Sequence, residues 1–172
     1  MTIKIKFIKN YNLDRSILLK IIKLKKQEWK NKFDDQILWT KKNIKRNDIH
    51  VVLYNEKFII GYTLLRKRKI KINNDQNINY YLFDTHIIDK KYRKKKFNNI
   101  MPSQILMNRI LDFIISKKLI SLLFCKKKIT KYYKSFGWKV FDKKKLTNHD
   151  KKDLVIMCFG KILKNKKYQI EI

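Results

Sequence analysis

The N-terminal third of the chain changes from an alternating pattern to a helical one. Residues 3–7 alternate apolar and polar side chains, which predicts a short strand with one buried face. Apolar residues then recur at helical spacing from Leu13 to Trp29, with Asn12 or Asp14 placed to cap the helix. A second helix is predicted to begin at Asp34 or Asp35.

The middle of the chain is rich in residues that favour strands. Residues 49–54 and 58–66 predict a hairpin, because a short polar turn separates two apolar runs. Gly61 lies inside the second run, where glycine often marks a bulge or a close backbone approach. Residues 70–79 are polar and Asn-rich, so we expect a hairpin tip there, followed by a third strand at 80–88.

The C-terminal half again mixes helical and strand patterns. We expect a basic loop, followed by a helix with Pro102 in its first turn and a strand. A short helix that ends at Gly137 and two more strands complete the chain. The loop covers residues 90–99, and the short helix covers 129–136. The strands are expected at 119–125, 138–141 and 153–162, with a polar connection at 143–152.

The complete pattern predicts one mixed α/β domain. The element order is β-α-α-β-β-β-α-β-α-β-β, with about seven strands in a central sheet. No linker, composition break or internal repeat divides residues 1–172. We therefore expect a single domain.

Charge is the unusual feature of the composition. The chain has 44 Lys and Arg against 14 Asp and Glu, a formal net charge of +30. Such an excess is typical of nucleic-acid-binding proteins. The abundance of Lys, Asn and Ile and the scarcity of Gly and Pro are also what an AT-rich coding sequence produces. Charge alone therefore leaves both explanations open.

The apolar segments and cysteines favour a cytoplasmic protein. No apolar stretch reaches the roughly 20 residues that cross a bilayer, and the N-terminus lacks the apolar block of a signal peptide. Cys125 and Cys158 both lie in apolar runs, so two buried thiols in a reducing compartment are expected.

The strand, basic loop and helix between residues 80 and 115 carry the most informative chemistry. A helix N-terminus presents unpaired N–H groups and the positive end of its dipole, which suits a diphosphate. The loop that enters this helix adds Arg93 and residues 94–96, and has no acidic residue after Asp89. The segment is suited to a ligand with a diphosphate and an apolar arm.

Residues 87–98 resemble the acetyl-CoA motif of the GNAT N-acetyltransferase superfamily. That motif has an apolar strand end, Arg or Gln, two variable residues, Gly, one variable residue, and Gly or Ala. Arg93 stands at the first position, five residues after Ile88. Lys96 and Asn98 stand where the glycines are expected, and of these two Asn tolerates left-handed backbone geometry better.

A second segment is similar to the later signature of the same superfamily. An apolar strand at 122–125 is followed by a Tyr132-Tyr133 pair on a short helix and then by Gly137-Trp138. Weaker likenesses are found at Trp39, at residues 48–50 and at 60–62.

The resemblance implies an enzyme that transfers an acetyl group directly from acetyl-CoA to a primary amine of a small molecule or amino sugar. The sheet is expected to splay between its fourth and fifth strands, after Ile88 and Cys125, where the pantetheine arm pairs like an extra strand. Tyr133 is the expected general acid for the leaving thiolate. The implied cofactor-binding residues are Ile87, Ile88, Arg93, Lys94, Lys95, Lys96, Phe97, Asn98, Cys125 and Tyr133.

The amine must lose a proton, and the candidate bases lie on the strand that ends at Ile88. Regular alternation would place Asp84 and His86 on the same face as Ile88. Each also has a structural explanation, as a hydrogen-bonding strand residue or a core histidine.

Cys125 precedes three lysines, which would lower the pKa of its thiol, yet no partner for covalent catalysis is placed by sequence. The histidines and cysteines lack metal-ligand spacing, so no metal is expected.

Two alternatives remain from the residues. The fold could serve a basic nucleic-acid-binding protein, or a non-catalytic interaction module, because the loop lacks glycine. If the protein is an enzyme, its positive charge favours an anionic acceptor. A monomer and a homodimer are both compatible with the sequence.

Overall fold

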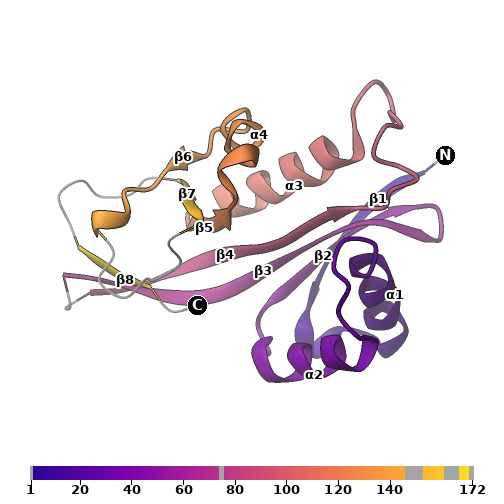
Figure 1. Cartoon of the computed structure of the whole chain (residues 1–172), viewed down its shortest axis with the longest axis horizontal. Helices are drawn as coiled ribbons and strands as arrows, with labels where there is room; N and C mark the ends of the chain where they lie inside the picture. Colours follow the sequence, from indigo (N-terminus) through magenta and orange to yellow (C-terminus); the bar gives the residue numbers. More distant parts are fainter. Residues whose placement is uncertain (1, 74–75, 146–152, 161–166, 171–172) are drawn as a thin grey trace. The chain divides into compact units, whose positions relative to one another are not determined.

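The computed structural model describes residues 2–73, 76–145, 153–160 and 167–170 (Figure 1). These residues fall into two compact units, residues 1–66 with 85–110 and residues 67–84 with 111–172. Strands β3 (Phe58–Ile72) and β4 (Gln76–Ile88) and helix α3 (Pro102–Ser116) each contribute residues to both units. The single domain over 1–172 stays a prediction.

The first unit contains the N-terminal strands and helices. Strand β1 (Ile3–Lys9) pairs antiparallel with β2 (Ile49–Asn55), and β2 pairs antiparallel with β3. Helix α1 (Arg15–Lys25) begins after Asp14, whose carboxylate accepts a hydrogen bond of 2.6 Å from the Ser16 amide. Of the two predicted caps, the chain uses Asp14. Trp29 lies beyond the helix end and is 41% exposed, so its predicted place on the apolar stripe is wrong.

Helix α2 (Phe33–Asn43) lies beside α1 in the same unit (Figure 1). Asp34 and Asp35 occupy its first turn, where negative charge stabilises a helix. The apolar face of α1 packs on β2 and β3, because buried side chains from all three elements form one core cluster. Its buried members are Ile21, Leu24, Ile44, Val52, Tyr62, Leu64 and Ile87.

Gly61 marks a bulge, as the sequence indicates. The pairing of β2 with β3 shifts register between Leu53 and Tyr54, which face Gly61 and Ile59. A Cβ atom on Gly61 would lie 2.7 Å from Ile88 Cδ1. The backbone of β3 therefore approaches the Ile88 side chain so closely that any side chain at position 61 would require Ile88 to move.

The second unit contains the C-terminal strands. Strand β4 pairs in parallel with β5 (Ile120–Cys125), and β5 pairs antiparallel with β7 (Val155–Phe159), which in turn pairs with β6 (Lys139–Val140). A 3₁₀ turn η2 (Lys127–Ile129) and helix α4 (Thr130–Lys134) follow β5, and Gly137 takes a φ of +84°. Short 3₁₀ turns also occur at η1 (Asn10–Asn12) and η3 (Lys143–Lys145).

The parallel ladder between β4 and β5 is short. It joins residues 80–82 to residues 120–122 and ends there, although β5 continues to Cys125 and stays paired with β7 along that length. The predicted parting of the fourth and fifth strands is therefore confirmed, and it begins at Leu82 and Leu122, earlier than the sequence indicates.

The β3–β4 hairpin is longer than predicted. Residues 70–79 were expected to form its tip, but β3 extends to Ile72 and β4 begins at Gln76; residues 74 and 75 lie outside the described residues. Ile70 and Ile72 are buried and alternate with exposed lysines, a strand pattern that the surrounding Asn-rich sequence hides.

The extension of β3 has a partner that the sequence did not predict. Strand β8 (Tyr168–Ile170) pairs antiparallel with residues 70–72, and Tyr168 and Ile170 join the buried cluster of this unit. The predicted last strand, 153–162, corresponds to β7, but residues 161 and 162 lie outside the described residues. The same holds for residues 146–152 of the predicted connection.

Candidate active site

The loop after β4 is fixed at its start by Asp89. Its backbone N–H donates to the Ile60 carbonyl at 2.8 Å. Its carboxylate accepts from the Gln27 amide at 2.9 Å and from the Lys91 N–H at 2.8 Å. The Lys90 N–H also donates to Gln27 Oε1 at 2.9 Å. The basic loop therefore leaves the sheet in a defined direction, held against the end of α1.

Arg93, the predicted diphosphate ligand, lies back along this loop. Its Nε donates to the Ile88 carbonyl at 3.0 Å, and its Nη2 forms an ion pair with Glu28. The Arg93 side chain is 40% exposed. A guanidinium has five N–H donors, so these two bonds leave donors for an anion.

The structure explains how the loop turns without the expected glycines. Asn98 and Asn99 take φ values of +48° and +64°, and Phe97 and Ile100 exchange backbone hydrogen bonds of 2.9 and 3.0 Å. This is the geometry of a two-residue turn with both central residues left-handed. Asn98 thus supplies the backbone geometry expected of the second glycine, whereas Lys96 needs no positive φ.

Aromatic and basic side chains cover the loop. The rings of Tyr92 and Phe97 are stacked with centroids 6.4 Å apart, and Lys95 Nζ lies 4.8 Å from the Tyr92 ring centroid. Residues 94–96 are exposed. At the start of α3, the Met101 N–H donates to Gln104 Oε1 at 3.0 Å, so a side chain caps this amide.

His86 is held by a polar partner. Its Nδ1 lies 2.8 Å from Thr63 Oγ1, and Thr63 is fully buried. Burial lowers the pKa of His86 from 6.5 to about 4. The imidazole is therefore neutral at pH 7 and has an unprotonated nitrogen, but it is a weaker base than a solvated histidine.

Asp84 and His86 were predicted to lie on one face of the sheet. That prediction requires regular alternation along the strand, and β4 is not regular at these residues. Thr85 has a φ of +53°, which is strained for a β-branched residue. Ile87 and Ile88, which follow it, are both buried. Asp84 is half-buried in the second unit and His86 belongs to the first.

Tyr133 lies in an aromatic cluster of the second unit. Its ring is 6.1 Å from that of Phe83, 6.0 Å from Trp138 and 5.3 Å from Tyr132 between centroids. Tyr133 is 8% exposed, and burial, followed by the nearby Tyr132 and Cys125, raises the pKa of its hydroxyl. Among the described residues, no hydrogen bond engages this hydroxyl. A neutral, unengaged hydroxyl is suited to donate a proton.

Cys125 differs from the expectation based on its lysine neighbours. The side chain is buried at the end of β5, and burial raises the pKa of its thiol. The predicted lowering is wrong, because the lysines that follow are exposed to water and desolvation dominates. Cys125 is therefore a poor nucleophile and serves as an apolar neighbour of Tyr133.

Sequence reasoning missed Gln27 and Glu28. These residues hold Asp89, Lys90 and Arg93, from which they are separated by more than 60 positions, so no local pattern reveals the contacts. Over the described ranges, no cluster of three or more His, Cys, Asp or Glu side chains could hold a metal ion. The helices in the same ranges are too short or too polar to span a bilayer.

No family model and no curated protein matches the sequence. Solved structures do match. An acyl-CoA N-acyltransferase from Pseudomonas aeruginosa aligns with a TM-score of 0.65 and 11% identity over 91% of this chain and 99% of its own. ElaA from Escherichia coli aligns with a TM-score of 0.65, 14% identity and the same coverage. Naa50 from Arabidopsis thaliana, in complex with the bisubstrate analogue CoA-Ac-MVNAL, aligns with a TM-score of 0.59 and 16% identity over 91% of this chain and 98% of its own.

At identities this low the likeness concerns the arrangement of the backbone. It extends over almost all of this chain and almost all of each matched structure. The chain therefore has the mixed α/β fold of the GNAT N-acetyltransferases.

Proposed function

We propose that this protein is an acetyl-CoA-dependent N-acetyltransferase that acts on a primary amine of a small molecule or amino sugar. The observation that carries the proposal is the short ladder between β4 and β5. Residues 123–125 continue β5 without a partner from β4, which suits the addition of an extended pantetheine arm. The likeness to acetyltransferase structures supports the same reading.

In the proposed cofactor site, the loop from Arg93 to Asn98 holds the diphosphate. The free donors of Arg93 and the exposed lysines at 94–96 provide the positive charge. Backbone groups of Ile87 and Ile88 pair with the pantetheine. The Ile88 carbonyl already accepts from Arg93, so one of its two lone pairs remains.

In the proposed reaction, the amine nitrogen attacks the thioester carbonyl. A C–N bond forms, the C–S bond breaks, and the thiolate takes the proton of the Tyr133 hydroxyl. Burial keeps this phenol protonated, and the same desolvation makes the thiolate a stronger base. The proton of the amine passes to His86, Asp84 or a water relay.

Two measurements test this proposal. Acetyl-CoA should raise the melting temperature, because a ligand of the native state at 100 times its Kd adds roughly 2.7 kcal/mol of stability. Absence of a shift at millimolar acetyl-CoA would contradict cofactor binding. Consumption of the thioester with a panel of small amines and amino sugars then identifies the acceptor class.

The role of Tyr133 has a matched control in its neighbour. Tyr133→Phe should lower kcat by roughly 10²–10⁴-fold, because proton transfer is lost, and should leave the acetyl-CoA Kd nearly unchanged. Tyr132→Phe removes a hydroxyl from the same helix and should change kcat little. Equal effects of the two substitutions would show that Tyr133 is not the acid.

The proposal extends to the setting of the enzyme. Cys125 and Cys158 are both free thiols, which supports a reducing, cytoplasmic location. We further propose that residues 1–172 form one domain, and that the acceptor carries negative charge because the protein has a net charge of +30. Size-exclusion chromatography with light scattering distinguishes a monomer from a homodimer.

A further inference from the structure

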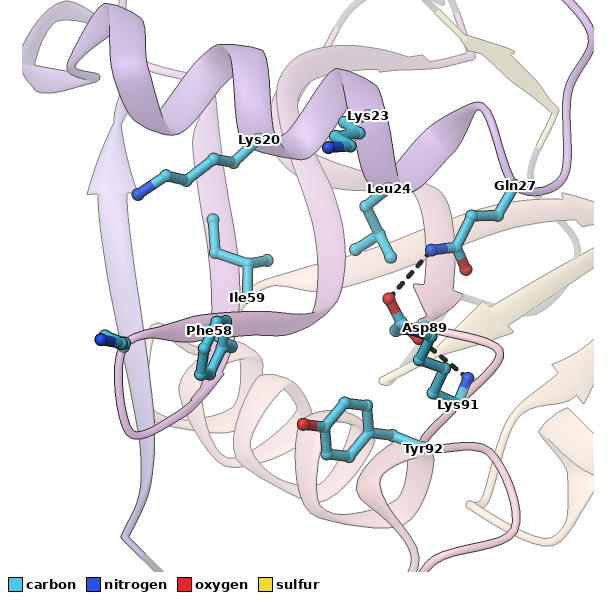
Figure 2. Close-up of a pocket in the computed structure, with 10 residues that line it drawn as sticks. Lys20, Lys23, Leu24, Gln27, Phe58, Ile59, Asp89, Lys91 and Tyr92 are labelled. Carbon is cyan, nitrogen blue, oxygen red and sulfur yellow. Dashed lines mark hydrogen bonds between the residues drawn. The ribbon is translucent and has the colours of Figure 1, made fainter.

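A cavity lies in the first unit, between α1 and the start of the loop after β4. Its volume is about 520 Å³, which is within the range of small-molecule sites (Figure 2). It is formed by the second half of α1, the start of β3 and the first residues of the loop after β4. Asp89, Lys91 and Tyr92 come from the segment 87–98, but none of the residues implied to bind acetyl-CoA lines the cavity.

The charged side chains of this cavity are almost all cationic. Lys20 and Lys23 come from α1, Lys57 precedes β3, and Lys91 follows β4. Within the part of the chain that the structure describes, no ion pair joins these lysines to a carboxylate. Four exposed ammonium groups around one cavity repel one another, and an anion relieves that repulsion.

Asp89 is the one carboxylate among the lining residues, and its oxygens already have partners. One accepts from the Gln27 side chain at 2.9 Å and the other from the Lys91 N–H at 2.8 Å, as the dashed lines in Figure 2 show. Both bonds fix the loop. Asp89 is therefore a structural element of the cavity wall, and the cavity as a whole attracts anions.

The rest of the lining is apolar and aromatic. Leu24 is buried, Ile59 is half-buried, and Phe58 remains 55% exposed beside the cavity. Tyr92 adds a second ring from the loop, and Figure 2 shows both rings on the side of the cavity opposite α1. Phe58 is the exposed ring, whereas Tyr92 is half-buried and stacked with Phe97. Aromatic rings stack on flat heterocycles, and lysines act as point-charge ligands for phosphate.

We propose that this cavity is a binding site for a nucleoside phosphate, separate from the acetyl-CoA site. The base packs against Phe58 and Tyr92, and the phosphate is held by Lys20 and Lys23. The proposal does not depend on acetyl transfer, because neither the loop from Arg93 to Asn98 nor Tyr133 takes part.

Calorimetric titration with adenosine 5′-monophosphate, adenosine and inorganic phosphate at low salt tests the site. Adenosine 5′-monophosphate should bind with a Kd below about 1 mM and the two fragments at least tenfold more weakly, since each retains only part of the contacts. Equal binding of phosphate alone, or no binding of the nucleotide, overturns the proposal.

Substitutions then locate the site. Lys20→Gln/Lys23→Gln should weaken the nucleotide roughly tenfold, as expected for two partly solvated charge contacts. Lys41→Gln/Lys42→Gln removes the same charge from the exposed end of α2 and should change the Kd less than twofold. Phe58→Ala, at an exposed position, should also weaken binding. If both lysine pairs have the same effect, binding is non-specific and the proposal fails.

Coenzyme A distinguishes the two sites, because it contains a nucleotide itself. With saturating coenzyme A present, the Kd for adenosine 5′-monophosphate should stay unchanged. Loss of nucleotide binding under these conditions would place the nucleotide in the coenzyme A site and overturn the proposal. If coenzyme A does not bind but the nucleotide does, the acetyltransferase proposal fails and this one stands.

Discussion

At the level of single residues, the backbone takes geometries that particular side chains allow. Gly61 approaches Ile88, Asn98 and Asn99 take left-handed φ values, and Thr85 holds a positive φ inside β4. Thr85, Asn98 and Asn99 lie in or beside segments assigned to the cofactor. Local backbone geometry therefore shapes the proposed site as much as side-chain chemistry does.

The contact between Gly61 and Ile88 can be tested by a double-mutant cycle. Gly61→Ala should destabilise the protein by about 1–3 kcal/mol, because the new Cβ atom overlaps Ile88 Cδ1. Ile88→Val removes that atom at a cost of about 1 kcal/mol. In the double variant the cost of Gly61→Ala should fall, as measured by urea unfolding. Additive costs would show that the two positions do not compete for space.

The turn at Asn98 predicts an order of stability among substitutions. Asn98→Ala should cost about 1 kcal/mol, because a left-handed φ is unfavourable for alanine, whereas Asn98→Gly should cost nothing. Asn108→Ala, on the exposed face of α3, serves as the control and should be neutral or stabilising. Thermal unfolding gives all three values, and equal behaviour of the two alanine variants would contradict the assignment.

At the level of elements, the proposed sites lie where a helix or a strand ladder ends. The β4–β5 ladder stops at Leu82 and Leu122, and the loop after β4 is held by the residues that follow α1. Helix α1 thus has two roles, since it also carries two of the cavity lysines. Its stability matters to both proposed sites.

The N-cap of α1 is therefore an informative position. Asp14→Ala should lower the melting temperature, because the Ser16 amide loses its acceptor and the helix N-terminus loses a negative charge. Asp14→Asn keeps an acceptor and should lower it less. Circular dichroism melting curves give the order. If the two variants melt together, the hydrogen bond does not contribute.

At the level of the whole molecule, the fully buried His50 and the half-buried His86 make stability depend on pH. His50 bonds to Tyr62 and Asn10 at 2.9 and 3.1 Å, and its pKa is lowered from 6.5 to about 4 by burial, as is that of His86. Unfolded histidines bind protons near pH 6.5, whereas the folded ones do so only near pH 4.

Stability should therefore be complete above pH 6.5 and fall progressively as the pH decreases to about 4, with uptake of up to about two protons on unfolding. The midpoint of urea unfolding, measured across this range, gives the dependence. His50→Gln and His86→Gln should each flatten the curve. An unchanged slope in both variants would mean that other groups cause the pH dependence.

The sequence by itself determined the order of the strands and α-helices from β1 to β7, the position of Pro102 in the first turn of α3, the irregularity at Gly61 and the left-handed tolerance of Asn98. These depend on neighbours a few positions apart, through hydrophobic period, capping and backbone sterics. The GNAT motifs could also be identified from the sequence, because they combine residue type with fixed spacing.

Only the tertiary structure decided the partners of those residues. Contacts between distant segments determine the pairing of β3 with β8 and the bonds of Gln27 and Glu28 to the basic loop. Burial determines the raised pKa of the Cys125 thiol. The lysine cavity likewise gathers Lys20, Lys57 and Lys91 from three segments. Sequence spacing carries no information on such contacts, because chain folding alone brings these segments together.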